Sequence, residues 1–213
     1  MKMTRRNYFR LLAEDQPHAG RWAPLWRPLL KMTSLLYQAA VGIRSLLYQW
    51  KIWKQRSFDR PVISIGNMVW GGTGKTPLVE YVARFYLSRG KTPLILARGY
   101  GQDESKELAH KLPEARFGIG EDRFRAGGEA LAQGSADVII LDDGFQHWAI
   151  RRNLDIVMIN VLNPFGNLSL IPRGILREPV TNLKRASLIV LNDVNLRPRK
   201  EVEELKKSIL GIV

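Results

Sequence analysis

Cysteine is absent from this chain of 213 residues, so disulfide bonds and thiolate metal sites are excluded. Acidic residues are missing from one long stretch, since none occurs between Gln16 and Phe58. Lys31, Gln38 and Arg44 interrupt the longest apolar stretches, so an uninterrupted membrane span is not expected. The basic start lacks a long apolar run ahead of a small-residue cleavage site, so no signal peptide is expected.

Positive charge is in excess and unevenly distributed. The chain has 33 Lys and Arg against 20 Asp and Glu, a formal net charge of +13. Residues 1–60 hold 12 of the basic and 3 of the acidic residues, so most of the excess lies there. A basic chain can bind nucleic acid, a membrane surface or an acidic ligand. The hydrophobic fraction of 45% is that of a folded protein.

A helical period of apolar residues runs from about Leu25 to Arg56, after an irregular basic leader at 1–24. Trp and Leu on one stripe with only positive charge elsewhere suit an anionic bilayer interface. A core-packing helix that happens to be basic is the alternative. The stripe consists of Leu29, Met32, Leu36, Ala39, Ile43, Leu46, Trp50 and Trp53, and the cations are Arg27, Lys31, Arg44, Lys51, Lys54 and Arg56.

Short apolar runs alternate with amphipathic stretches after residue 58. This alternation predicts a doubly wound, mostly parallel α/β domain at 59–213, preceded by the leader and helix at 1–58. The expected strands are 62–66, 93–98, 115–119, 138–141, 154–161 and 187–191. The expected helices are 75–88, 104–112, 123–133 and 200–210. Several strands are apolar on both faces, which is typical of a parallel sheet covered by helices.

A glycine-rich loop between the first strand and the first of these helices predicts a phosphate-binding site. Its glycines let backbone N–H groups converge on phosphate oxygens, and the helix N-terminus adds partial positive charge. The lysine can reach outer phosphates and the following hydroxyl can ligate Mg²⁺. The strict pattern has glycine where Val69 stands, and an ordinary glycine-rich turn is the alternative. The candidate residues are Val69, Trp70, Gly71, Gly72, Thr73, Gly74, Lys75 and Thr76.

Two carboxylates, Asp142 and Asp143, end the apolar strand at 138–141. P-loop enzymes place an acid at such a strand end to hold Mg²⁺ directly or through water. A plain turn or helix cap is the alternative. His147 follows and is a candidate for orienting phosphate or substrate, although a single histidine is more often a structural residue.

Five motifs in this order and spacing resemble the lipid A 4'-kinases (tetraacyldisaccharide 4'-kinases): GNMVWGGTGKTP, ARGYG, EDR, DDGFQH and NPFGNLSLIPRGILREP. The resemblance implies transfer of the ATP γ-phosphate to the 4'-hydroxyl of a tetraacylated glucosamine disaccharide in lipid A synthesis. It implies ATP and Mg²⁺ as cofactors, with an acylated lipid and an anionic membrane as partners. It places the protein peripherally on the cytoplasmic face of the bacterial inner membrane.

The resemblance also assigns roles to single residues. Asp103 is the catalytic candidate for activating the hydroxyl, with a helix N-cap as its structural alternative, and Lys75 holds the phosphates. Thr76, Asp142, Asp143 and Glu178 are the candidate magnesium-associated residues. His147 and Arg177 are the candidate substrate residues.

The chain departs from the family pattern in several places. The loop between Gly101 and Asp103 is short, Trp148 replaces the usual Arg, and Asn153 replaces an Asp. Members are typically much longer, and the part expected to be missing is a C-terminal lobe that closes over the nucleotide. A non-catalytic nucleotide- or lipid-binding remnant is therefore one alternative, and an unrelated membrane-associated P-loop ATPase is another. Nucleic-acid binding is the least favoured, because the basic helix is rich in Leu and Trp.

Overall fold

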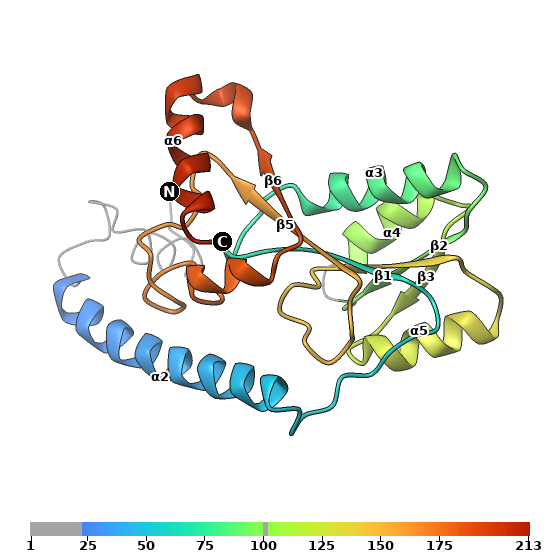
Figure 1. Ribbon diagram of the computed structural model, residues 1–213, viewed down its shortest axis with the longest axis horizontal. Helices are drawn as coiled ribbons and strands as arrows, with labels where there is room; N and C mark the ends of the chain where they lie inside the picture. Colours follow the sequence, from blue (N-terminus) through green and yellow to red (C-terminus); the bar gives the residue numbers. More distant parts are fainter. Residues whose placement is uncertain (1–22, 100–101) are drawn as a thin grey trace.

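Six parallel strands form one sheet in the computed structural model, which describes residues 23–99 and 102–213 (Figure 1). The predicted basic leader at 1–24 lies almost wholly outside these residues. The sheet order is β3-β2-β4-β1-β5-β6, and every neighbouring pair is parallel. The strands are β1 Val62–Asn67, β2 Pro93–Ala97, β3 Arg116–Ile119, β4 Val138–Asp142, β5 Leu154–Asn160 and β6 Leu188–Asn192.

Helices cover both faces of this sheet, as the apolar strands require. Helices α3 and α4 pack on one face with Ile63, Ile65 and Ile140, whereas α5 packs on the other face with Leu96 and Ile139. The predicted doubly wound α/β fold is confirmed, and each predicted strand or helix of this domain agrees with the structure to within two residues. The helices are α3 Lys75–Leu87, α4 Gln102–Lys111, α5 Arg123–Ala132 and α6 Arg199–Leu210, with 3₁₀ turns η1 Val180–Arg185 and η2 Val194–Leu196.

The position of β1 determines where a ligand can bind. The chain passes from β1 to β2 and β3 on one side, then returns through β4 and continues to β5 and β6 on the other. In open α/β sheets, ligands bind outside the carboxyl ends of the strands where the order reverses. The carboxyl ends of β1 and β4 lie at this point, and they carry the phosphate loop and the paired aspartates.

Helix α2, Ala23–Gln49, lies along the outside of the domain (Figure 1). It ends seven residues before the predicted end at Arg56, so the predicted extent is wrong. Lys51 has a positive φ of 58°, which breaks the helix. Arg56 then pairs with a second segment, because its N–H donates to Ala149 O at 2.7 Å and its carbonyl accepts from Arg151 N at 2.8 Å.

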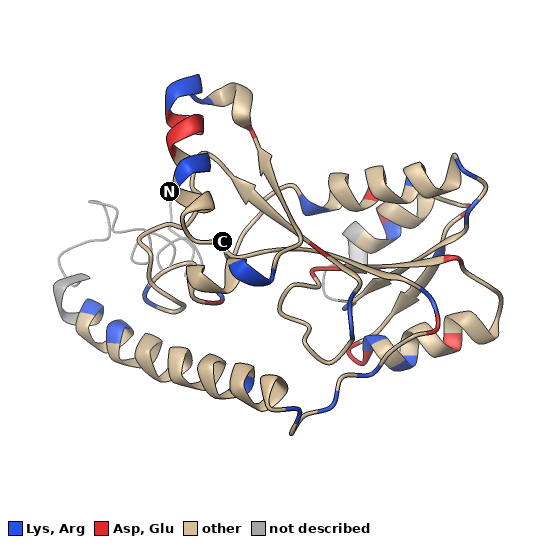
Figure 2. Cartoon of the chain, in the orientation of Figure 1, with Lys and Arg blue, Asp and Glu red and all other residues tan. Residues whose placement is uncertain are grey.

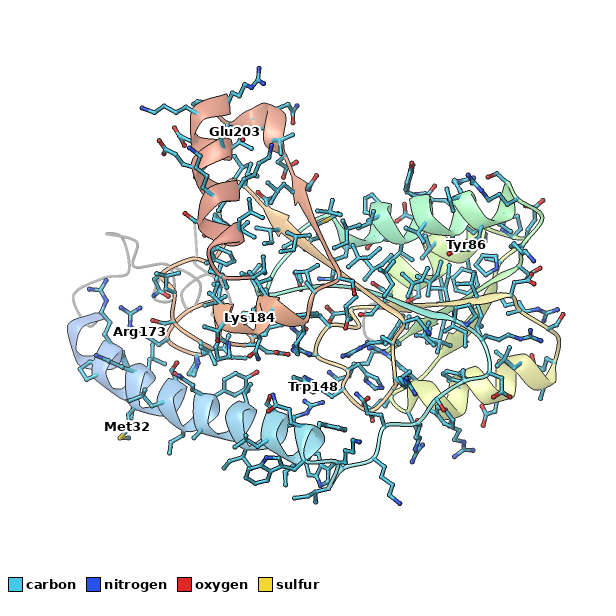
Figure 3. All side chains as sticks on the ribbon, in the orientation of Figure 1. Met32, Tyr86, Trp148, Arg173, Lys184 and Glu203 are labelled. Carbon is cyan, nitrogen blue, oxygen red and sulfur yellow. The ribbon has the colours of Figure 1, made fainter. Side chains whose placement is uncertain are left out.

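The predicted apolar stripe of α2 faces away from the domain. Met32 is 56% exposed and Leu36 is 67% exposed, and Figure 3 shows Met32 pointing outward. The opposite side contacts the domain: Ser34 Oγ donates to Leu170 O at 2.8 Å and Tyr37 Oη donates to Arg177 O at 3.0 Å. Among the described residues, the stripe is therefore not part of the hydrophobic core.

The charge on α2 is of one sign. Figure 2 shows Lys and Arg but no Asp or Glu along this helix. Among the described helices, none is long and apolar enough to cross a membrane. The division into segments 1–58 and 59–213 stays a prediction.

Candidate active site

The phosphate loop enters α3 through a left-handed glycine. Gly74 has φ 80° and ψ 24° and caps the helix, and Gly71 has φ 137°, so both adopt backbone conformations that other residues rarely adopt. A side chain at Gly74 would also lie only 2.7 Å from Asn192 Nδ2. Two independent constraints, conformation and space, therefore require glycine immediately before Lys75.

Two asparagines at strand ends hold the loop. Asn67, the last residue of β1, is buried and donates through Nδ2 to Thr73 Oγ1 at 2.8 Å. Asn192, the last residue of β6, donates through Nδ2 to Thr73 O at 3.3 Å. The first part of the loop pairs with protein instead, because Trp70 N donates to Ile175 O at 2.7 Å. The amide of Trp70 is therefore paired with a protein carbonyl, and the nucleotide-binding role of the whole segment 69–76 stays a prediction.

A cavity of about 270 Å³ lies at the start of α3. Lys75 and Thr76 line it together with Asp142, which ends β4, and Asp143, which follows. Lys75 Nζ lies 3.5 Å from Asp143 Oδ1. The structure thus brings the predicted lysine, threonine and paired acids together around one space.

The two aspartates have opposite electrostatic environments. Burial by itself would raise the pKa of Asp143, but Arg177 at 2.8 Å and Lys75 hold that pKa below its usual value. Burial raises the pKa of Asp142, and the neighbouring charge of Asp143 raises it further. The site therefore contains one firmly ionised carboxylate beside one whose ionisation is costly until another cation arrives.

The oxygen donors in this cavity suit a hard cation. Protein sites for Mg²⁺ usually supply one or two carboxylates, and waters and substrate phosphates complete the coordination. The described residues contain no group of three or more His, Cys, Asp or Glu that could hold a metal by itself. Thr76, Asp142 and Asp143 fit a magnesium ion that is shared with a phosphate ligand.

Glu178, predicted as a further metal-associated acid, lies elsewhere. Its side chain is buried, and its Oε2 accepts hydrogen bonds from Arg185 Nη2 at 2.5 Å and Asn182 Nδ2 at 2.7 Å. It does not line the cavity around Lys75. The structure places this carboxylate in an ion pair within the connection between β5 and β6, apart from the other three predicted ligands.

A second cavity, of about 450 Å³, lies between α2 and the carboxyl edge of the sheet. It shares four lining residues with the first cavity: Arg98, Arg123, Asp143 and Arg177. Helix α2 contributes Tyr37 and Arg44 to its wall, and the segment after β4 contributes Gln146 and His147. Four arginines against two acids make this cavity suitable for an anionic ligand.

The two predicted substrate residues differ in charge. Arg177 lines both cavities and pairs with Asp143 at 2.8 Å. Burial lowers the pKa of His147 to about 4, and the charges of Arg123, Arg152 and Arg44 contribute to the shift. His147 is therefore neutral at physiological pH, so it can offer hydrogen bonds but no positive charge.

Asp103, the catalytic candidate, lies in the first turn of α4. The helix begins at Gln102, so Asp103 does not occupy the position before the helix that the N-cap alternative assumed. Its side chain lies outside the described part of the structure. Ser105 of the same helix lines the first cavity, which places the start of α4 beside Lys75 and Arg123. The catalytic role of Asp103 stays a prediction.

Three residues of the candidate site were not singled out from the sequence. Asn67 and Asn192 hold the loop, and Arg123 stands between the cavities with its side chain 4% exposed. The asparagines end apolar strands, and polar residues at the carboxyl ends of neighbouring parallel strands meet at one edge. The sequence therefore contained a signal that could have identified the two asparagines. Arg123 follows Asp122, the N-cap of α5, and its burial could not be read from the sequence.

The family model for LpxK, described as tetraacyldisaccharide-1-P 4'-kinase, matches residues 26–211. A probable mitochondrial tetraacyldisaccharide 4'-kinase of Arabidopsis thaliana is 40% identical over 86% of this chain and 54% of its own length. The tetraacyldisaccharide 4'-kinase of Geobacter sulfurreducens is 39% identical over 86% of this chain and 58% of its own length. The chain thus spans just over half the length of these relatives.

Solved structures agree with these matches. The crystal structure of LpxK from Aquifex aeolicus in complex with ATP superposes with a TM-score of 0.73 and 33% identity, covering 81% of this chain and 61% of that one. The cell division protein FtsY of Thermotoga maritima gives a TM-score of 0.51 at 17% identity, which indicates a shared fold alone. By sequence profile, by curated relatives and by structure, this chain belongs to the tetraacyldisaccharide-1-P 4'-kinase family.

Proposed function

We propose that this protein transfers the γ-phosphate of ATP to the 4'-hydroxyl of a tetraacylated glucosamine disaccharide 1-phosphate, a step of lipid A synthesis. The observation that carries the proposal is the pair of joined cavities. One contains Lys75 and Thr76, the other faces α2, and both share Arg98, Arg123, Asp143 and Arg177. A donor phosphate and an anionic acceptor can therefore meet at one set of residues.

The first cavity is the proposed ATP site. The LpxK structure from Aquifex aeolicus, which contains ATP, supports this because it shares the fold and 33% identity. In this chain Gly74 and the start of α3 direct backbone N–H groups at phosphate, and Lys75 supplies a cation. Thr76, Asp142 and Asp143 would hold Mg²⁺, which supplies charge neutralisation at the phosphates when it is bound.

The second cavity is the proposed acceptor site. Its arginines would attract the phosphate of the lipid, and Arg123 and Arg177, which line both cavities, would stabilise the charge that develops on the transferred phosphoryl group. The oxygen of the 4'-hydroxyl bonds to the γ-phosphorus as the bond to the β-γ bridging oxygen breaks, and ADP leaves. Asp103 takes the proton of the hydroxyl in this proposal. Positioning and charge neutralisation supply most of the rate increase.

Helix α2 is the proposed contact with the membrane surface on the cytoplasmic side. Its outward apolar residues would enter the interface between headgroups and acyl chains, and its cations would meet anionic headgroups. Because α2 also lines the arginine-rich cavity through Tyr37 and Arg44, a lipid acceptor could stay in the bilayer while its sugar reaches the site.

The deciding experiment measures transfer of label from [γ-³²P]ATP to tetraacyldisaccharide 1-phosphate in mixed micelles by the 213-residue chain. We expect label in the lipid fraction, dependent on Mg²⁺ and absent with an acceptor that is already phosphorylated at the 4'-position. Nucleotide binding without lipid labelling would support the non-catalytic alternative instead. Release of inorganic phosphate without lipid labelling would support a P-loop ATPase.

A further inference from the structure

Arg185, the last residue of η1, is held between two aromatic rings. Its guanidinium carbon lies 4.2 Å from the ring centre of Phe145 and 3.9 Å from that of Trp148. Its Nη2 donates to Glu178 Oε2. Its Nε is buried with no hydrogen-bond partner among the described residues, as expected for a guanidinium stacked on rings.

The segment that Arg185 contacts carries Asp143. Phe145 and Trp148 belong to the turn of residues 143–148 between β4 and β5, and Asp143 has a left-handed φ of 49°. A residue other than glycine in this conformation is held there by its surroundings. Phe145 also packs closely on β1. A Cβ atom added at Gly66 would lie only 2.6 Å from Phe145 Cβ. The stacked rings therefore link Asp143 to the strand that leads into the phosphate loop.

The same contacts reach α2. Trp148 stacks on Tyr48 of α2, with ring centres 5.8 Å apart and planes inclined by 26°, and it lies between that helix and the domain in Figure 3. Gln55 Nε2 donates to Trp148 O at 2.9 Å, and Arg44 Nη2 donates to Gln146 O at 3.0 Å. The turn that carries Asp143 is thus fixed by Arg185 on one side and by α2 and the segment after it on the other.

We propose that Arg185 is a positioning residue for Asp143, and that Glu178 acts by holding Arg185 rather than by binding metal. The side chain of Arg185 is only 20% exposed and that of Glu178 is 3% exposed, and two charges so far removed from water are stable only as well-placed partners of each other. The planar guanidinium fits between the two rings, whereas a lysine ammonium keeps the charge but loses the stacking. This inference rests on the proposed function in one respect: it takes Asp143 to act beside a bound phosphate.

The first test is hydrogen exchange of the full chain without nucleotide. In Arg185→Lys we expect the amides of Gly144, His147 and Trp148 to exchange at least about tenfold faster, because the turn loses its stacked partner. Trp148→Leu should have the same effect, and Trp148→Phe should restore most of the protection. The control is Arg84→Lys, since Arg84 also pairs with an acid, Glu80, and a backbone carbonyl.

Unchanged exchange at 143–148 in Arg185→Lys would overturn the proposal. So would equally faster exchange across all strands, because that would indicate a general loss of stability. This readout needs no ATP, so it decides the positioning of the turn even if the proposed function fails.

The second test titrates Mg²⁺ into each variant with a fluorescent ATP analogue. For Arg185→Lys we expect the midpoint of the Mg²⁺ dependence to rise several-fold while binding without Mg²⁺ is unchanged. Glu178→Gln should also loosen the turn, because Arg185 loses its ionised partner. A shifted Mg²⁺ midpoint in Glu178→Gln with normal exchange at 143–148 would show that Glu178 acts on the metal, against the proposal. An unchanged midpoint in Arg185→Lys would overturn the link to Asp143.

Discussion

Two regions of this protein carry positive charge, and they carry it differently. On α2 Lys31 and Arg44 are exposed beside exposed apolar side chains, and there is no acid between Gln16 and Phe58. At the carboxyl edge of the sheet the cations lie in cavities and contact an acid, as Lys75 and Arg177 contact Asp143. Exposed charge acts over a Debye length and is screened by salt, whereas buried charge acts at contact distance. One arrangement suits an extended surface and the other a defined ligand.

The largest expected effect comes from removing a cation at the sheet edge. Lys75→Ala should lower the rate of transfer by roughly 10²–10³-fold or more, because a preorganised charge at the phosphates is lost. Nucleotide affinity should fall as well. Isothermal titration calorimetry and the labelling assay measure the two effects.

The matched control for this change is Lys91→Ala. Lys91 Nζ lies 3.6 Å from Asp137 Oδ1, nearly the separation of Lys75 and Asp143, but this pair is exposed and lines neither cavity. Its removal should leave transfer unchanged. Equal effects of the two substitutions would contradict the assignment of the phosphate loop.

The next test distinguishes the roles of two carboxylates, Asp103 and Asp143. Asp103→Asn should lower turnover strongly with Mg²⁺-ATP affinity nearly intact, because a general base acts on the acceptor. Asp143→Asn should instead raise the Mg²⁺ concentration needed for half-maximal rate. Initial rates measured over a range of Mg²⁺ concentrations distinguish the two outcomes. The same metal-dependent defect in both variants would remove the separate role of Asp103.

A smaller effect is expected on α2. Leu36→Glu places a charge on the outward face, and we expect binding to anionic vesicles to weaken by about 10- to 100-fold, since burying one leucine contributes about 1.5–3 kcal/mol. Binding of the unchanged protein should weaken as salt increases. Vesicle sedimentation measures both, and thermal stability should not change because Leu36 is 67% exposed.

Glu80→Leu, which removes an acid and adds an apolar side chain on α3, is a control for nonspecific attraction to vesicles. Vesicle binding by Leu36→Glu equal to that of the unchanged protein would mean that the outward face of α2 meets something other than a lipid surface.

The sequence was informative where local patterns set the structure. Apolar runs located all six strands, and the loop at Gly71–Thr76 with the acids at 142–143 located the first cavity. The order β4-β1-β5 brings strand ends together, so this part of the site follows from topology.

The rest depends on contacts between residues far apart in the chain. Arg185 meets Phe145 and Trp148, and Asn192 meets Thr73 across 119 positions. No periodic pattern in the sequence predicts contacts between residues that are so far apart in the chain. Glu178 is an example, because its ion pair with Arg185, seven residues further along the chain, is not part of the LREP motif and could not be predicted from it.

The last and smallest expected effect is on the pH dependence of the free energy of unfolding, and it compares the two charged regions. Burial, with Arg123, Arg152 and Arg44, lowers the pKa of His147 to about 4, so between pH 6.5 and about 4 the unfolded chain binds a proton that the folded chain does not. The free energy of unfolding should therefore fall as the pH is lowered through this window. In His147→Gln that part of the decrease should disappear, whereas His110→Gln, at an exposed position on α4, should retain it. Urea unfolding measured from pH 7 to pH 4.5 tests this.

Added salt should change the pH slope of the free energy of unfolding little if the arginines act on His147 at short range, in contrast to vesicle binding by α2. An identical pH slope in the unchanged protein and His147→Gln would mean that this histidine is not held neutral by its surroundings.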